Sequence, residues 1–485
     1  MSMNPIVYIN YKKDAMYPSH DFNPSYIYPE YPFSDNDINT EVQINDAYEM
    51  VRECLKGYGL DRKNFNTKEW NPLMEYIKPG NTVLIKPNLV MDHNENKNAG
   101  KYDLECLVTN PACIRAICDY CIIALKGIGK LIIADAPMQG CDFNALTKKM
   151  HLDDLVKFYE NKGIIVELQD LRQYESIFNR NKVIVGKNEG NSKGVLVKLG
   201  KKSTHRKDGN QKYQVSDYDK EDTQHFHNGE NHDYEVSASV LEADTIINFC
   251  KPKTHRLAGI TASMKNLVGI TYNKASLPHR TAGSVSEGGD AYNKNSWLKK
   301  KADDALTAKI RAEKVGKIAE ATIYRYIYGG LLVLGRLVSK DKSYIGSWYG
   351  NDTIWRTICD LAYIVKFADK NGLICNTAQR KMLNIGDMII AGEGNGPVSP
   401  SPKFLGILLI SDECYAFDET VARIMGFDIM KIPLIKNIIN NNTWIEHNDI
   451  MVWSNHKRLR GNLQNIQFPH RWKFRPHDGW GVLKK

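Results

Sequence analysis

The stretch from Ala243 to Arg280 reads ADTIINFCKPKTHRLAGITASMKNLVGITYNKASLPHR, and it decides the fold that we expect. Its first part, residues 245–250, is a short apolar run rich in β-branched side chains, which is typical of a buried strand in an α/β sheet. Lys251, Lys253 and His255 follow at once. Because open α/β sheets bind ligands beyond the carboxyl ends of their strands, we expect a binding site at this point.

The rest of the stretch adds polar groups at close spacing. Lys265 lies ten residues after His255, Asn266 stands beside it, and His279 and Arg280 close the stretch. Lysines and histidines separated by glycines suit an anionic substrate and proton transfer. Each residue taken alone is as well explained by a solvated strand end or a loop histidine, but solubility explains the whole set poorly.

The chain before this stretch alternates between strand and helix patterns. TVLIKP at residues 82–87 and KLIIAD at 130–135 predict buried strands, and Asn110-Pro111 predicts the start of a helix that runs to about residue 125. Another helix over 153–161 and a strand over 163–168 continue the pattern. This order predicts βαβ units and a parallel sheet, with polar groups at the strand ends that include Lys86, Asn88 and Asp135.

The predicted fold is therefore α/β, with a mostly parallel sheet, a polar insertion, a second α/β lobe and an extended tail. The expected parts are an N-terminal segment and helix (1–80), a central α/β domain (81–290) with a polar insertion (187–235), a helical and apolar linker (291–350), a second α/β part (351–435) and an aromatic and basic tail (436–485).

Size and composition limit the class of protein. The chain has 485 residues, is 42% hydrophobic and carries a net charge of +9, which is ordinary for a globular protein with an ample core. The charge is compatible with anionic substrates but too dispersed to indicate nucleic acid. We see no secretory signal, and the ten cysteines are scattered. A reducing cytoplasm fits these features best, and the sequence leaves the oligomeric state open.

Two segments have competing interpretations. In the polar insertion, His225, His227 and His232 lie near Asp217, a spacing that can bind a divalent metal, although solvated loop histidines are commoner. The apolar segment 318–338 is too short and too interrupted to span a bilayer. It predicts a core helix first, and a peripheral contact with an anionic membrane second.

Further candidates come from later in the chain. Gly394, Asn395 and Gly396 form a glycine-rich loop that can hold phosphate, although no GK[ST] motif follows it. Carboxylates at strand ends and turns can hold a divalent cation or orient the bases. We expect these metal candidates to be Asp135, Asp290 and Asp412, with Asp92 as a further carboxylate of this kind.

Several of these motifs together are familiar. IKPNLV, IIADAP, ADTIINFCKPKTH, GITASMKNLVGI, EGGDAY, WYGNDTIWR, AGEGNGPVS and DECYAFDETVARIMGFD resemble the Domain of Unknown Function 362 family over roughly residues 80 to 430. Some members of that family carry iron–sulfur cysteine motifs, which this chain lacks, so we expect no cluster. The resemblance implies a role in cell-surface polysaccharide metabolism.

A fainter resemblance concerns mechanism. A strand, a histidine, a lysine ten positions on and a later histidine are similar to the pattern of the lactate racemase family, which uses a lysine-tethered nickel cofactor. The matching positions are His255, Lys265 and His279. The loop here is poorer in glycine, and that family's early acidic motif is not evident. The resemblance thus implies a shared fold, with nickel as a hypothesis.

Three functions follow from the sequence. The first is an enzyme that acts on a small anionic or sugar-like substrate by acid–base chemistry, with or without a divalent metal. Its expected catalytic residues are His255, Lys265 and His279, and its expected binding residues are Lys86, Asn88, Lys251, Lys253, Asn266, Arg280, Gly394, Asn395 and Gly396. The alternatives are a non-catalytic glycan- or membrane-associated binding protein and a metal-dependent enzyme of the racemase or epimerase kind.

Overall fold

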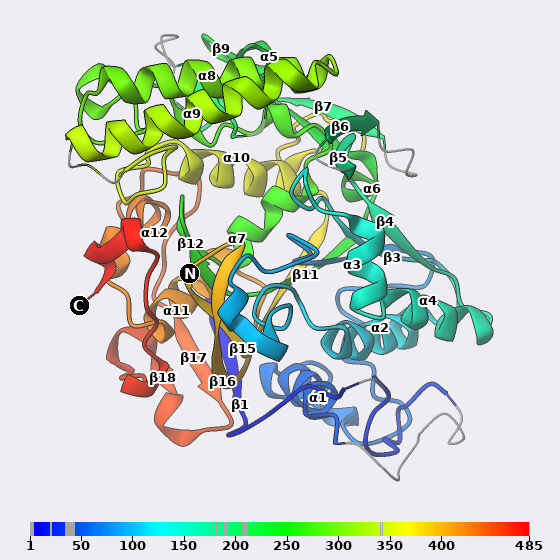
Figure 1. The fold of residues 1–485 in the computed structure, drawn as a ribbon. Helices are drawn as coiled ribbons and strands as arrows, with labels where there is room; N and C mark the ends of the chain where they lie inside the picture. Colours follow the sequence, from blue (N-terminus) through cyan, green and yellow to red (C-terminus); the bar gives the residue numbers. More distant parts are fainter. Residues whose placement is uncertain are drawn as a thin grey trace.

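A large mixed sheet runs through the molecule in the computed structural model, which describes residues 4–19, 22–33, 44–179, 182–187, 193–205, 212–216, 218–339, 341 and 343–484 (Figure 1). One half of the sheet is parallel, in the order β4-β3-β2-β11-β15. These strands are β2 (Thr82–Pro87), β3 (Lys130–Asp135), β4 (Val166–Asp170), β11 (Thr245–Cys250) and β15 (Lys381–Asn395). The predicted strands over residues 82–87, 130–135 and 245–250 are confirmed.

The other half of the sheet is largely antiparallel. β16 (Ser399–Ser411) forms a hairpin with β15, β1 (Ile6–Tyr11) pairs antiparallel with β16, and the edge is made by β17 (Met451–Ser454) and β18 (Gly461–Asn462). β1 comes from the N-terminal segment, for which the sequence predicts no strand. It is an inner strand between β16 and β17, and its Val7 and Ile9 side chains are fully buried in the core on one face of the sheet.

Helices cover both faces of the sheet and create two cores. On β2, Leu84 faces one core while Val83 and Ile85 face the other, as expected for a strand buried on both sides. One face is covered by α1 (Asp46–Tyr58), α2 (Pro111–Leu125), α3 (Phe143–Lys149) and α4 (Leu152–Asn161). The other face is covered by α6 (Ala238–Leu241), α7 (Ser263–Asn266), α10 (Ile354–Phe367), α11 (Cys414–Ile424) and α12 (Pro433–Ile439).

Helix α2 shows how the local sequence sets an element boundary. Asn110 caps the helix by accepting a hydrogen bond from the Ala112 N–H at 2.9 Å, and Pro111 occupies the first turn. Proline is tolerated there because its missing N–H has no partner inside the helix. The predicted helix start is thus confirmed, and α2 joins β2 to β3 as the crossover of a βαβ unit.

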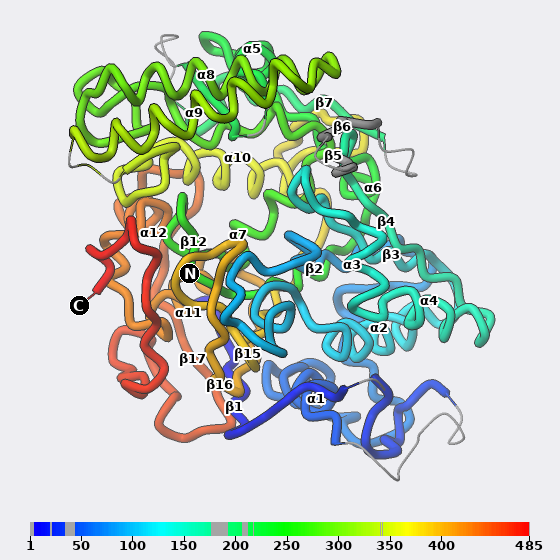
Figure 2. Tube along the Cα trace, in the orientation of Figure 1, coloured from blue at the N-terminus to red at the C-terminus, as the bar shows by residue number. Residues whose placement is uncertain are grey.

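The insertion and the linker form an outer layer. The insertion and the residues next to it form β5 (Tyr174–Asn179), β6 (Lys182–Lys187), β7 (Gly194–Lys198), β8 (Tyr213–Gln214), α5 (Lys220–Phe226), β9 (His227–Asn228) and β10 (Asn231–Ser237), and β8 pairs with β14 (Arg280–Thr281). The linker forms a helical hairpin of α8 (Trp297–Lys314) and α9 (Ile318–Ser339), which lies at the outside of the molecule (Figures 1 and 2). Among the described residues, no helix is long and apolar enough to cross a membrane.

Candidate functional site

A pocket of about 130 Å³ lies at the carboxyl ends of β2, β3 and β11, where the sequence predicts a site. We call it the lysine pocket, because Lys86 on β2, Lys253 on β12 (Lys253–His255), Lys265 on α7 and Lys274 after α7 all line it. Of the residues predicted from the sequence, it brings together Lys86, Asn88, Asp135, Lys253, His255, Lys265, Asn266 and His279.

One wall of the pocket is a short hairpin formed by β12 and β13 (Gly259–Thr261). His255 pairs with Gly259 in this hairpin. Gly259 has a φ of +81° and lies close against the ring of Trp480, so a side chain there would be both strained and crowded. The hairpin therefore fixes the position of His255 against the C-terminal tail.

The pocket holds more positive charge than its own carboxylate balances. Lys86 Nζ lies 2.7 Å from Asp135 Oδ1 in a buried ion pair. Asp135 is the one acidic residue in the described lining of the pocket. No hydrogen-bond acceptor for the Lys265 amine is found in the part of the chain that the structure describes. An anionic ligand would complete this charge balance with charge-assisted hydrogen bonds.

A chain of amide side chains orients Lys253 and the floor of the pocket. Lys253 Nζ donates to Asn88 Oδ1 at 2.9 Å and also to the Leu107 carbonyl. Asn88 in turn donates to Asn266 Oδ1 at 2.8 Å, and Asn266 donates to Asn248 Oδ1 at 2.8 Å. Asn88 and Asn266 therefore act mainly on the lysine and on the backbone, as positioning residues.

Burial shifts the pocket lysines toward the neutral amine. Burial is the main cause for Lys253, whose pKa falls to about 7. Burial and the charges of Lys274 and Lys86 lower the pKa of Lys265 to about 7, and burial lowers the pKa of Lys274 to about 8. Near neutral pH these amines are divided between charged and neutral forms, which suits groups that bind anions or accept protons.

The two histidines present complementary ring nitrogens. His255 Nδ1 accepts hydrogen bonds from the N–H groups of Leu257 and Ala258, at 3.0 and 3.2 Å, so its proton is on Nε2. His279 Nδ1 lies 2.7 Å from the Leu277 carbonyl oxygen, so Nδ1 carries the proton and Nε2 has the lone pair. Burial and the charge of Lys265 lower the pKa of both rings, to about 3 for His279. One neutral ring can donate and the other can accept.

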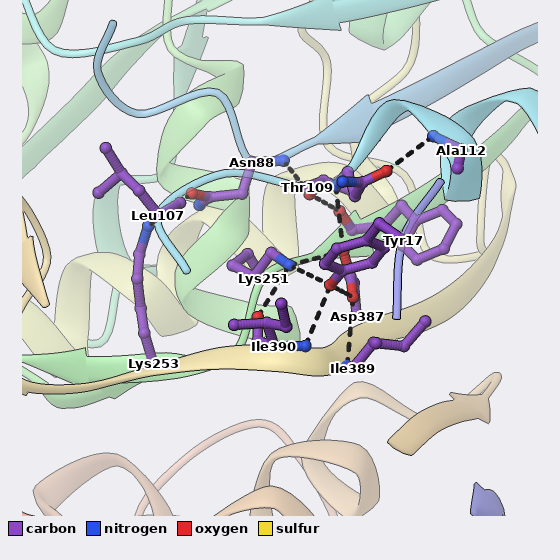
Figure 3. A network of polar contacts seen from close by, with 12 residues as sticks. Tyr17, Asn88, Leu107, Thr109, Ala112, Lys251, Lys253, Asp387, Ile389 and Ile390 are labelled. Carbon is purple, nitrogen blue, oxygen red and sulfur yellow. Dashed lines mark hydrogen bonds and ion pairs between the residues drawn. The ribbon is translucent and has the colours of Figure 1, made fainter. Parts of the chain in front are cut away.

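Lys251, predicted to bind substrate, lies outside the lining of the pocket. Its amine is fully buried and lies 2.6 Å from Asp387 Oδ2, and it also donates to the Tyr17 hydroxyl and the Ile390 carbonyl (Figure 3). Lys251 follows the end of β11, and Lys253 begins β12. Lys253 lines the pocket, and its amine donates to Asn88 and to the Leu107 carbonyl (Figure 3).

Arg280 also lies outside the lining of the pocket. Its Nε donates to Gln214 Oε1 at 2.9 Å, and its Nη2 lies 3.7 Å from Asp303 Oδ1. Arg280 begins β14, and His279 lies just before this strand. His279 lines the pocket, whereas Arg280 is buried outside the lining.

The glycine-rich loop is part of a hairpin that contacts the C-terminal tail. β15 continues to Asn395, whose side chain donates to Asp478 Oδ2 at 3.1 Å. Gly394 lies against the guanidinium of Arg475, and the Gly396 carbonyl accepts from the Arg256 N–H at 3.0 Å. The backbone groups of the expected phosphate loop are thus engaged with the strands and the tail.

The three aspartates expected to hold a metal lie in three different places. Asp135 is in the lysine pocket, whereas Asp290 accepts hydrogen bonds from Thr281 and Thr353 beside a separate pocket. Asp412 follows the last residue of β16, which runs antiparallel to β15, so it lies at the opposite edge of the sheet. The described residues contain no group of three or more side chains suited to bind a metal.

The histidines of the insertion are placed differently from the solvated loop that the sequence favours. His227 and His232 are fully buried, with their Nδ1 atoms 3.2 Å apart, and His227 Nε2 lies 2.9 Å from the Ser276 carbonyl. His225 lines a second cavity near α8. Asp217, expected beside them, lies outside the described residues.

Sequence reasoning missed three cations that shape the site. Lys274 and Arg256 line the pocket, and both belong to the stretch from Ala243 to Arg280. Their closeness in sequence to Lys265 and His255 could have identified them as members of the site. Arg172 is buried and pairs with Asp170. Its Nη1 also donates to three carbonyls of the loop that follows β3, those of Met138, Gln139 and Cys141. Nothing in the local sequence indicates this role.

Comparison with known proteins gives one match. The family model that matches is described as Domain of unknown function (DUF362), and the match covers residues 149–423, more than half of the 485-residue chain. The match includes His255, Lys265, Lys274 and His279, and it begins after Lys86 and Asp135. No curated protein and no solved structure matches the chain.

Proposed function

The chain belongs to the DUF362 family, whose description assigns no activity, and from this premise we propose that it is an enzyme acting on a small anionic substrate in the lysine pocket. The observation that carries the proposal is the charge of the pocket: its described lining residues include four lysines, two neutral histidines and Arg256 but a single carboxylate. Structural ion pairs normally balance such charges, whereas perturbed and unbalanced groups in a pocket favour a functional site.

The roles follow from the hydrogen bonds and pKa shifts. Lys253 and Lys274 bind the anionic group, together with Lys86, whose charge Asp135 partly balances. Lys265 is the general base, because its amine, unlike that of Lys253, has no hydrogen-bond acceptor among the described residues, and its pKa of about 7 gives a large neutral fraction at neutral pH. From the sequence, His255, Lys265 and His279 are expected together as catalytic residues, and the proposal gives the role of the base to Lys265.

Proton transfer next to the anionic group is the reaction class that we propose. The neutral Lys265 amine accepts a proton from a substrate carbon that lies next to a carbonyl, and the electron pair of the broken C–H bond forms a C=C bond while the carbonyl oxygen becomes an enolate oxygen. His255 Nε2–H donates a hydrogen bond to that oxygen, and His279 Nε2 accepts one from a substrate hydroxyl. Return of the proton from Lys265 to a different atom or face gives an isomerised or epimerised product with no net redox change.

The finer identity of the substrate is part of the same proposal. Phosphorylated sugars and sugar acids combine an anionic group with hydroxyls that can bind the two histidines, which suits a role in polysaccharide metabolism in the cytoplasm. We assign no metal to the site, since Asp135 is the one carboxylate in its described lining.

Deuterium exchange tests this function. The protein is incubated in D₂O with a panel of sugar phosphates and uronic acids, and incorporation of deuterium is followed by proton NMR. We expect exchange at one carbon of at least one compound, slowed about 100-fold or more in Lys265→Met. Lys436→Met, an exposed lysine on α12, is the matched control and should exchange at the normal rate. Equal exchange rates in Lys265→Met and the wild type would remove Lys265 as the base.

A further inference from the structure

A second, larger cavity adjoins the lysine pocket on the side of α5 and α8. It has a volume of about 670 Å³, within the range of ligand-binding cavities. Met138, Gln139 and Tyr218 line both the lysine pocket and this cavity. A ligand bound in the lysine pocket can therefore extend past these three side chains into the larger space.

The second cavity is suited to an uncharged, apolar part of a ligand. Its apolar lining residues come from several segments, namely Met91, Met138, Tyr174, Tyr218, Phe226, Ala275, Leu306 and Ile310. The charged residues of its wall are paired with other residues of the protein. Lys309 lies 2.8 Å from Glu313, and Lys314 lies 2.9 Å from Asp222. The two cavities together thus match an amphiphile, an anion with an apolar tail.

The hairpin that lines this cavity also has an exposed apolar face. α8 contributes Leu306 and Ile310 to the cavity, and α9 packs against α8 at the outside of the molecule (Figure 1). The large apolar side chains of α9 that remain exposed form one stripe at helical spacing, made of Ile323, Tyr326, Ile327, Val333, Leu334, Leu337 and Val338. We call this set the α9 stripe. A helix that is apolar on both sides needs a partner on both sides.

Charge and aromatic residues around the α9 stripe favour a lipid surface as that partner. Arg325 and Arg336 are exposed on the helix, and Glu320 is the one acidic residue between residues 318 and 339. Trp297 is exposed at the start of α8, which lies against Gly335 near the end of α9. Arginine and tryptophan around an apolar stripe are typical of helices that lie on an anionic membrane without crossing it.

We propose that the anionic substrate carries an apolar lipid tail, so that its sugar-like anionic head binds in the lysine pocket and its tail occupies the second cavity. The α9 stripe docks the protein on the anionic membrane surface that supplies this lipid. The inference rests on the proposed function for the anion-binding role of the lysine pocket, and it adds the class of substrate and the place where the substrate is met. A substrate of this kind explains two features together: its tail fills the large apolar cavity, and the membrane that supplies it covers the α9 stripe.

Binding of a chain-bearing anion tests the substrate class. Inorganic phosphate and monododecyl phosphate, the latter below its critical micelle concentration, are titrated calorimetrically into the protein. We expect the dodecyl compound to bind at least about 30-fold more tightly, because several methylene groups leave water. Ile310→Glu, in the cavity, should remove this gain and leave phosphate binding unchanged. Leu373→Glu, at an exposed position that lines neither cavity, should keep it.

Sedimentation with vesicles tests the docking surface. We expect the wild type to co-sediment with vesicles that contain phosphatidylglycerol and to stay in solution with pure phosphatidylcholine. The double variant Tyr326→Glu/Leu337→Glu should lose vesicle binding and still bind monododecyl phosphate in solution. Two results overturn the inference. One is equal affinity of the wild type for the two phosphates. The other is a wild type that does not co-sediment with anionic vesicles and forms a dimer that the double variant abolishes. Failure to bind either phosphate would instead refute the proposed function on which the inference rests.

Discussion

At the scale of single residues, Lys251 and Lys253 differ in whether a carboxylate of the protein neutralises their charge. Lys251 has a carboxylate, a tyrosine hydroxyl and a carbonyl within 3.1 Å, and it is sealed from the pocket. Lys253, two residues later, bonds only neutral oxygens and faces the pocket. The first lysine holds the sheet together, and the second is available to an anion.

Replacing each of these two lysines by methionine should separate the two roles. Lys251→Met leaves Asp387 buried without its cation, so the free energy of unfolding should fall by about 3–5 kcal/mol, measured by urea denaturation. Lys253→Met should cost less stability, since it leaves no charge unpaired, and should weaken sulfate binding about 10-fold or more. If Lys251→Met is as stable as the wild type while Lys253→Met binds sulfate normally, the assignment of the two roles is wrong.

At the scale of elements, a single arginine side chain holds the backbone of the loop that follows β3. Arg172 follows β4 and donates to the carbonyls of Met138, Gln139 and Cys141, while Asp170 balances its charge. Since Met138 and Gln139 line both cavities, Arg172 sets the shape of the passage between them.

Arg172→Met should therefore affect both stability and binding. It leaves three carbonyls and Asp170 without their donor, so we expect a loss of about 3 kcal/mol or more in the free energy of unfolding. Monododecyl phosphate should also bind less tightly. Arg62→Met is the matched control, because Arg62 bonds the Gly57 carbonyl at an exposed position and should change little. Unchanged ligand binding in a folded Arg172→Met protein would show that the loop holds its shape without this clamp.

The elements also show what can be predicted from the sequence. The strands β2, β3 and β11 are evident because each is a short apolar run with polar residues directly after it. The direction of β16 cannot be read from the sequence, since an apolar run has the same pattern in either direction. For this reason Asp412 was expected at the wrong edge of the sheet. β1 was missed because its neighbours, β16 and β17, lie some 400 residues away in the sequence.

At the scale of the whole molecule, the C-terminal tail closes the site from outside. Trp480 is fully buried, its Nε1 donates to the Arg256 carbonyl at 2.7 Å, and its ring lies against Gly259. The tail therefore supports the hairpin that carries His255. The sequence predicts a strapped-down tail but not what it touches, because these contacts join segments more than 200 residues apart.

Trp480→Ala should loosen this closure. The lost ring leaves a cavity in the core, which costs about 3–5 kcal/mol in the free energy of unfolding. The freed hairpin should also weaken sulfate binding several-fold, since Arg256 and His255 line the pocket. Val482→Ala, in the same terminal segment but partly exposed, is the control for stability. If the Trp480→Ala protein bound sulfate as tightly as the wild type, the tail would have no role in shaping the site.

The candidate site was predictable in its residue types and in its location, but not in its exact members. The carboxyl-end rule for parallel strands placed Lys86, Asp135 and Lys253 together, as the structure does. Arg280 was expected to bind substrate beside His279, but its side chain bonds Gln214 and lies near Asp303 instead. The pKa shifts could not be foreseen, since they depend on burial and on charges that only the fold brings near.

The affinity of the wild-type protein for sulfate between pH 6 and 9, measured calorimetrically, tests the central claim that the lysine pocket binds anions. Sulfate keeps its charge over this range, so a change in affinity reports on the protein. Lysine charge is present below the pKa and lost above it, and the pKa values are about 7 for Lys253 and Lys265 and about 8 for Lys274. We predict tight binding at pH 6 that weakens at least about 10-fold by pH 9. An affinity that does not change with pH, or no binding at pH 6, would contradict the account.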